Sequence, residues 1–149
     1  MTSSSVPGQP QPPSHVLRPE EIERFDRGNG VVTVPFVGRW NTEGNTVTTG
    51  MTVFSPGTGI PLHSHNVEET VLVFQGEATA VIGEESFDLV AGQATWVPAG
   101  VPHCFRNRGE GSMTIYWVYG GRDVTRTVTA TGETFEHLSD RDRGATPAS

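Results

Sequence analysis

Short β-type runs separated by glycine and proline fill the middle of this chain, from about residue 31 to residue 129. The runs are rich in Val, Thr, Ile and aromatic residues, which favour strands. They are VVTVPF, NTVTTGMTVF, ETVLVF, ATAVI, SFDLV, ATWV, HCFRN and MTIYWVYG. A long helical periodicity is absent, whereas parallel α/β folds need helices to cross between their strands. The pattern therefore predicts an all-β domain, with a hairpin turn at Gly83 and Glu84.

The chain of 149 residues has the length of one domain with a substantial core. Residues 1–17, rich in Ser, Pro and Gln, are expected to form a disordered arm. Residues 18–138 are expected to form the single domain, and residues 139–149 a flexible tail. RPEEIERF predicts a short helix over residues 18–25, and TGETFEHLSDRDR predicts one helical turn near the end of the domain.

Charge and residue usage exclude several classes of function. The formal net charge is −7, and all ten basic residues are arginine. This balance argues against a nucleic-acid or anionic-membrane partner, because both bind clustered positive charge. With no lysine, the chain cannot form a Schiff base. A single cysteine, no leader-like N-terminus and no run of about 20 apolar residues indicate a cytoplasmic protein.

Three of the five histidines lie in two short segments of the strand region. In the first segment, PLHSHNVEE, alternation along a strand places His63, His65 and Glu69 on one side if the chain stays extended. The same alternation places Glu68 on the other side. Two imidazoles and a carboxylate that converge suit a divalent first-row transition metal. The spacing therefore indicates a metal site and ranks Glu69 above Glu68 as a ligand.

A second segment, GQATWVPAGVPHCFRN, places His103 at the start of another strand. Together the two segments resemble the paired signatures of the cupin superfamily, and the spacing matches in full. The matching positions are Gly57, His63, His65, Glu69 and Gly76 in the first motif, and Gly92, Pro98, Gly100, His103 and Asn107 in the second. The one departure is Gln93, where an acidic residue is common in the family.

The resemblance implies a double-stranded β-helix, or jelly-roll barrel, with short flanking helical segments and one divalent transition metal per chain. The ligands that it implies are His63, His65, Glu69 and His103. Iron is the first choice, with Mn, Ni, Co and Zn as alternatives, because imidazole nitrogen and carboxylate oxygen suit all of these ions. Open coordination positions are left for a small-molecule substrate, water or dioxygen. A homodimer is also expected, as is usual for the superfamily.

Other side chains are candidates for a pocket or for proton transfer. Phe105 shares the face of His103 and is a candidate for the pocket wall, with core packing as the alternative. The remaining pocket candidates, for which packing or the surface is the alternative, are Trp40, Arg39 and Trp96. A catalytic base is to be sought among Glu68, Tyr116 and Tyr119. His15 and His137 lie outside the motifs and are predicted to be surface or core residues.

Three functions remain open because one fold can carry many chemistries. The first hypothesis is a metal-dependent oxygenase of dioxygenase type that acts on a small organic molecule. The second is a redox-neutral isomerase or lyase in which the metal is a Lewis acid. That reaction requires a base, and the sequence shows none at a compelling position. The third is a non-catalytic cupin that binds a small molecule.

Overall fold

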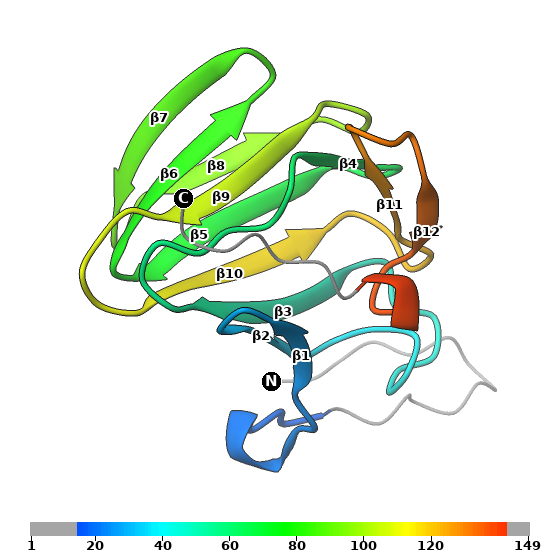
Figure 1. The fold of residues 1–149 in the computed structure, drawn as a ribbon. Coiled ribbons are helices and arrows are strands. Elements are labelled where there is room, and N and C mark those ends of the chain that lie inside the picture. The colour runs from blue at the N-terminus through cyan, green and yellow to red at the C-terminus, as the bar shows by residue number, and fades with distance from the viewer. Residues whose placement is uncertain (1–14, 143–149) are drawn as a thin grey trace, which may run out of the picture.

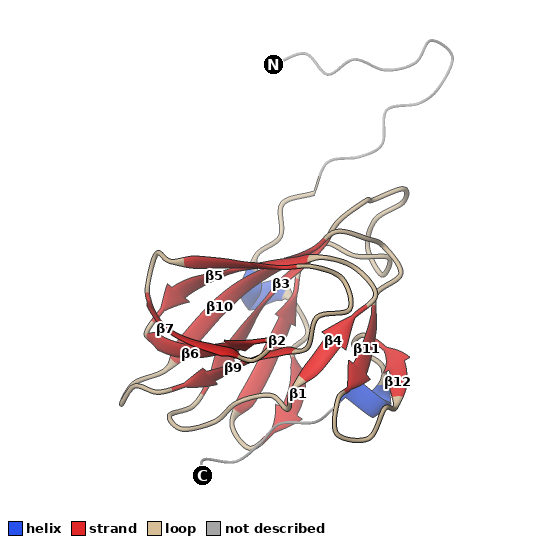
Figure 2. Cartoon of the chain, turned by 90° about the horizontal axis from the view of Figure 1, so that it is seen from above, coloured by secondary structure: helices blue, strands red, loops and turns tan. Residues whose placement is uncertain are grey.

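The computed structural model describes residues 15–142, whose regular secondary structure is almost entirely antiparallel strands in two sheets (Figures 1 and 2). The strands are β1 Phe25–Gly28, β2 Val31–Pro35, β3 Thr48–Phe54, β4 His63–His65, β5 Glu69–Gln75, β6 Glu77–Ile82, β7 Glu85–Val90, β8 Ala94–Val97, β9 His103–Asn107, β10 Met113–Tyr119, β11 Thr125–Val128 and β12 Thr134–Glu136. Two single turns of 3₁₀-helix, η1 Pro19–Glu21 and η2 Asp140–Asp142, flank the strands.

Two six-stranded sheets face each other as the layers of a jelly roll (Figure 2). The first has the order β1-β2-β3-β10-β5-β8, and the second has the order β12-β11-β4-β9-β6-β7. The all-β jelly-roll prediction is confirmed. The expected barrel is not closed, because the ladders of hydrogen bonds among the described residues stay within each sheet. The interior is therefore a gap between two layers, and it is open to side chains from both.

Alternation along the strands builds the core in that gap. In β5, Val71 and Val73 are buried, whereas Leu72 and Phe74 between and after them point outward. The buried side chains that the two sheets contribute are mainly aliphatic and aromatic. They include Val31, Phe54, Val71, Val73, Ala78, Ala80, Phe105, Met113, Ile115, Trp117, Tyr119 and Val124.

Two tight turns depend on glycine. The β6–β7 hairpin pairs Ile82 with Glu85, and Gly83 between them has a φ of 62°, so the predicted hairpin is confirmed. Gly76 joins β5 to β6 with a φ of 84°. A Cβ at Gly76 would lie 2.5 Å from the carbonyl oxygen of Ser112, so both conformation and space require glycine there.

All eight predicted runs form strands, and the predicted C-terminal turn is η2. The helix predicted over residues 18–25 is wrong beyond the turn Pro19–Glu21. Phe25 instead begins β1 and pairs with Thr33 of β2, because sheet pairing outweighs a weak helical preference. Residues 1–14 and 143–149, most of the predicted arm and tail, lie outside the described residues. Within residues 15–142, no helix is long and apolar enough to cross a membrane.

Candidate metal centre

Three imidazoles from one sheet meet a carboxylate from the other in the gap between the layers. His63 of β4 is the direct partner of His103 on β9, and His65 follows two residues along β4. Glu69 begins β5 in the opposite sheet. All four side chains are buried. One ligand nitrogen from each histidine lies within 4.8 Å of the other two.

Residues 66–68 carry the chain from one sheet to the other, so it does not stay extended between His65 and Glu69. Asn66 fixes this crossing, because its side chain donates to the carbonyl of Asp123 at 2.8 Å and accepts from the amide of Thr125 at 2.8 Å. Glu69 therefore faces the histidines across the gap. Glu68 is exposed and accepts a hydrogen bond from Trp96 Nε1 at 2.9 Å. Alternation selected the glutamate that faces the histidines, although the chain reaches it by a different path.

Backbone carbonyls fix the tautomer of each histidine. The Nδ1 atoms of His63, His65 and His103 lie 2.7, 2.9 and 2.9 Å from the carbonyl oxygens of Pro61, Thr125 and Val101. A carbonyl oxygen only accepts, so each Nδ1 carries the proton and donates it. Each Nε2 then keeps a lone pair, which is the arrangement of a metal-ligating histidine with a backbone partner.

The free ring nitrogens and the Glu69 carboxylate lie close enough together to share one cation. His103 Nε2 lies 2.8 Å from Glu69 Oε1, and His65 Nε2 lies 3.8 Å from Glu69 Oε2. Nε2 of both histidines and Oε1 of Glu69 are buried without a hydrogen-bond partner. Because each of these atoms offers only electron pairs, the cluster requires a shared positive charge. The residues present therefore fit a bound transition metal ion.

The electrostatics of the gap favour neutral imidazoles. Burial lowers the pKa of His65 to about 3, although the neighbouring Glu69 carboxylate acts in the opposite direction. Burial, followed by the nearby Arg126 guanidinium, lowers the pKa of His63 well below its ordinary value. Burial alone would raise the pKa of Glu69, but His103, His65 and Tyr119 together bring it below its ordinary value. Neutral imidazole and ionised carboxylate are the forms that bind metal.

We expect the free energy of unfolding of the metal-free protein to fall as the pH is lowered from about 6.5 toward about 3. The unfolded chain takes up a proton on His65 near the ordinary pKa of 6.5, whereas the folded chain does so only near about 3. Below 6.5, each imidazole that stays neutral only in the folded state costs about 1.4 kcal/mol per pH unit. Urea unfolding of EDTA-treated protein between pH 7 and pH 5 measures this slope. If a His65→Gln variant lost stability with falling pH as steeply as the wild type, His65 would not be a source of this pH dependence.

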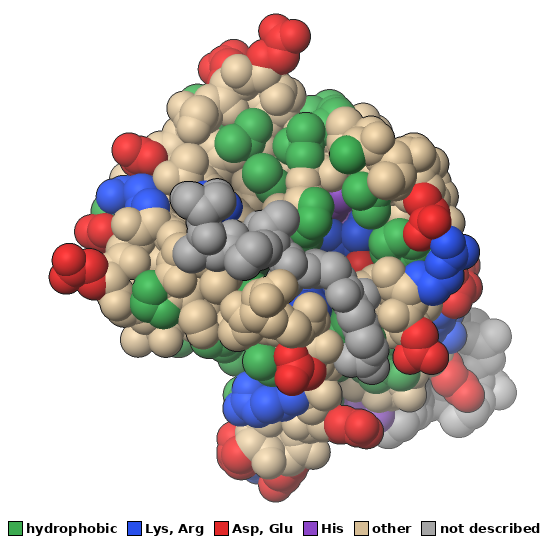
Figure 3. All heavy atoms as spheres, in the orientation of Figure 1, with side chains coloured by type: hydrophobic (Ala, Val, Ile, Leu, Met, Phe, Trp, Pro, Cys, Tyr) green, Lys and Arg blue, Asp and Glu red, His purple; other side chains and the backbone are tan. Residues whose placement is uncertain are grey.

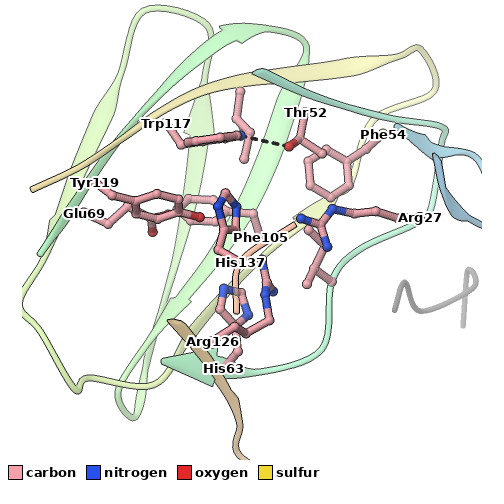
Figure 4. Close-up of a pocket in the computed structure, with 12 residues that line it drawn as sticks. Arg27, Thr52, Phe54, His63, Glu69, Phe105, Trp117, Tyr119, Arg126 and His137 are labelled. Carbon is pink, nitrogen blue, oxygen red and sulfur yellow. Dashed lines mark hydrogen bonds between the residues drawn. The ribbon is translucent and has the colours of Figure 1, made fainter. Parts of the chain in front are cut away.

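A small cavity adjoins the cluster (Figure 4). Its lining combines polar groups with apolar walls from both sheets: Arg27, Thr52, Phe54, Ile60, His63, Glu69, Phe105, Ile115, Trp117, Tyr119, Arg126 and His137. Phe105 and Tyr119 are the two candidates outside the ligand set that the structure brings to this cavity. Tyr119 is the register partner of Glu69 in the neighbouring strand, and its ring centroid lies 4.6 Å from that of His65.

Besides Glu68, four other candidates lie away from the cavity. Tyr116 alternates to the outer face of its sheet, where its ring packs 6.2 Å from that of Phe36. Trp40 and Trp96 are 44% and 62% exposed. Arg39 is paired with Glu136 near the surface at 2.9 Å. Each of these side chains belongs to an outer face or a loop, and the sequence pattern does not separate those positions from interior ones.

Three cavity residues were missed by the sequence pattern. His137 is buried against the rings of Trp117 and Tyr119, with centroids 5.1 and 4.9 Å away. Burial lowers the pKa of His137 well below its ordinary value. Arg27 and Arg126 are each 4% exposed and come from β1 and β11, two strands that were not predicted. The only signal for Arg126 was its place in the run TRTV.

The fold and the site define a class of protein, the β jelly rolls with a histidine cluster between their sheets that could hold a metal ion. The family model for the cupin domain matches residues 50–119, the segment that carries all four proposed ligands. Over these residues the chain matches the cupin domain, and its overall fold is that of cupins. The resemblance of the two histidine motifs to this family is confirmed.

Curated relatives and solved structures agree with this assignment. The chain is 27% identical over 138 residues to a quercetin 2,3-dioxygenase of Bacillus subtilis, covering 92% of this chain and 40% of the relative. It is 29% identical over 112 residues to the HTH-type transcriptional regulator PuuR of Escherichia coli, covering 74% of this chain and 59% of the relative. The chain thus spans less than two thirds of these relatives.

Solved structures share the fold at low sequence identity. An RmlC-like cupin from Shewanella frigidimarina has a TM-score of 0.63 at 19% identity, covering 74% of this chain and 94% of that one. Oxalate decarboxylase from Bacillus subtilis has a TM-score of 0.72 at 19% identity, covering 85% of this chain and 35% of that one.

Proposed function

We propose that this cupin is a metal-dependent oxidoreductase of dioxygenase type that acts on a small organic molecule. The observation that carries the proposal is the buried cluster of three Nε2 lone pairs and one carboxylate. In this proposal His63, His65, Glu69 and His103 hold one transition metal, with iron as the first choice. The similarity to a quercetin 2,3-dioxygenase over most of this chain supports the oxygenase class.

The residues around the cluster have separable tasks. A bound iron ion supplies the redox chemistry that an oxygenase requires. Phe105, Ile115 and Trp117 line the cavity and exclude water from it. Tyr119 interacts with the Glu69 carboxylate, and its pKa is raised well above 10 by burial and then by Glu69. Its hydroxyl therefore stays protonated at neutral pH and acts as a donor that orients the carboxylate.

Oxygen consumption tests the proposed reaction class. The protein is purified anaerobically without an affinity tag, reconstituted with Fe(II) and mixed with a panel of diketones, thiols and phenols. Substrate-dependent oxygen uptake that the His103→Ala variant lacks is the expected result. Stoichiometric metal with no oxygen uptake for any compound would count against the oxygenase.

One observation favours a redox-neutral isomerase or lyase as the second candidate. Such a reaction needs an acid–base group beside the metal, and His137 lines the cavity together with Glu69. Burial lowers its pKa, so the imidazole is neutral with a free lone pair at neutral pH, and it is a weak base in this setting. Two results would together support this candidate. The wild type would form product under strictly anaerobic conditions, and a His137→Gln variant would lose turnover while it retains the metal. The similarity to PuuR keeps a third candidate, a non-catalytic binding domain.

A homodimer is proposed through the outer face of the first sheet, which has β1 and β8 at its two edges. Leu72, Phe74 and Trp96 are exposed there on β5 and β8, and Phe74 is 64% exposed. A contiguous apolar strip of this kind marks an association surface. Phe74→Asp is expected to convert the dimer to a monomer in multi-angle light scattering. Phe87→Asp, at an exposed phenylalanine of the other sheet, is expected to leave the dimer intact. A monomeric wild type, or a dimeric Phe74→Asp, would contradict the assignment.

A further inference from the structure

Two buried arginines share one buried carboxylate at the C-terminal side of the cavity. Asp142 lies 3.2 Å from Arg27 Nη1 and 2.7 Å from Arg126 Nε through its Oδ1 atom. Its Oδ2 atom accepts from Arg27 Nη2 at 3.3 Å and from the amide of Leu138 at 2.8 Å. The three charged side chains are each at most 5% exposed. Figure 4 shows both guanidinium groups beside the cavity that adjoins His63 and Glu69.

This cluster carries an excess of positive charge. Two guanidinium groups face one carboxylate among the described residues, and Glu69 is engaged with the histidines. A bound divalent cation adds further positive charge nearby. A buried guanidinium without a full counter-charge is costly, because desolvation is not offset by ion pairing. An anion beside the cluster would supply the missing charge.

The two arginines differ in how many donors they have left. Arg27 uses Nε for Thr33 at 2.9 Å and both terminal nitrogens for Asp142. Arg126 lies against Asp142 through Nε, yet that atom is buried without a well-aligned hydrogen bond. Arg126 also borders a second cavity that Arg27 does not reach. Of the two, Arg126 is the arginine that can receive a ligand.

The second cavity has room for a small organic molecule. Its volume is about 230 Å³, and it shares Ile60, His63 and Arg126 with the cavity beside the metal centre. The remaining lining residues are Pro61, Val128, Thr131, Glu133, Phe135, Arg141 and Asp142. Figure 3 shows arginine and histidine side chains together at the surface, bordered by hydrophobic side chains. An apolar body would contact Ile60 and Phe135 while a charged end reaches Arg126.

We propose that Arg126 binds the carboxylate of the substrate, and that the substrate class is small organic carboxylates with an apolar body. The planar guanidinium presents parallel N–H donors, which match the two oxygens of a carboxylate. Arg126 is the register partner of His65 on the adjacent strand, so a molecule held there lies directly beside the metal centre. This proposal rests on the proposed function of that centre and names the class of molecule that it acts on.

Calorimetric titration with benzoate and benzamide tests the proposal. The two probes match in size and differ in charge, and both the metal-loaded and the EDTA-treated full chain are titrated. Metal-free protein removes direct coordination of the carboxylate as an explanation. Benzoate is expected to bind both forms at least about tenfold more tightly than benzamide, as for a charge-assisted hydrogen bond.

Variants locate the site. Arg126→Gln is expected to weaken benzoate binding at least about tenfold, and Arg126→Lys is expected to restore part of it, because lysine keeps the charge without the planar fork. Arg39→Gln, at a surface arginine outside both cavities, is the matched control and should bind benzoate like the wild type. Equal affinity for the two probes in the wild type would overturn the proposal, even if a variant failed to fold. Benzoate binding that survives Arg126→Gln would also overturn it.

The two proposals fail separately. If the metal assignment is wrong, the purified protein will contain no metal and will consume no oxygen. The anion site is tested separately, by benzoate binding to the metal-free protein. Metal retention without selective benzoate binding would refute the carboxylate site and leave the metal centre in place.

Discussion

Replacing His103 with alanine is expected to weaken metal binding by more than about a hundredfold and to leave the purified protein without stoichiometric metal. His103 contributes the Nε2 atom that lies 2.8 Å from Glu69 Oε1. Changes to groups that only orient a ligand already cost about 10–100-fold in metal affinity, so removal of a ligand should cost more. Elemental analysis, followed by competition with a chromophoric chelator, measures the loss. His65→Ala is expected to behave in the same way.

Glu68→Ala is the matched control for this prediction. Glu68 is exposed and is hydrogen-bonded to Trp96 on the outer side of the sheet, so its removal should leave metal content unchanged. Glu69→Ala, one residue further along, should lose the metal. Equal losses in the two glutamate variants would show that the carboxylate ligand has been assigned to the wrong side of the sheet.

The second large effect is expected at Asp142, which holds the C-terminal turn η2 against β1 and β11. Asp142→Ala leaves the buried guanidinium groups of Arg27 and Arg126 without their shared carboxylate. Removing one partner of a buried ion pair costs about 3–5 kcal/mol, because the remaining charge is buried and uncompensated. The loss is measured as a decrease in the free energy of unfolding in urea at pH 7.

Glu133→Ala provides a surface comparison. Glu133 pairs with Arg141 at 2.6 Å, but the two side chains are 46% and 64% exposed. An exposed pair of this kind contributes about 0–1 kcal/mol. If Asp142→Ala and Glu133→Ala had the same effect on unfolding, the buried cluster would have no special role in holding the C-terminal turn.

Local composition was sufficient to predict most of the fold. Runs such as ATWV and HCFRN match β8 and β9 at both ends, because β-branched and aromatic residues are bounded there by glycine and proline. The strands β1, β11 and β12 were not predicted, since FDRG, TRTV and TFE carry charged or flexible residues. These segments become strands by pairing with neighbours distant in the sequence, and local preference does not contain that information.

The four proposed ligands were predictable because they lie in two segments with fixed spacing. The residues that complete the cavity were not, because they come from the unpredicted strands and from the segment that follows β12. Arg27, Arg126 and Asp142 were hidden for a second reason. Charged residues are normally predicted to lie at the surface, and only the three-dimensional pairing makes their burial possible.

The central claim is that His63, His65, Glu69 and His103 hold one transition metal between the two sheets. The most direct test is the metal content of protein purified anaerobically without an affinity tag, determined by elemental analysis alongside the His103→Ala variant. We expect close to one transition metal ion per chain in the wild type, with iron first, and none in the variant. A wild type that retains no more metal than His103→Ala, before and after reconstitution, would contradict the claim.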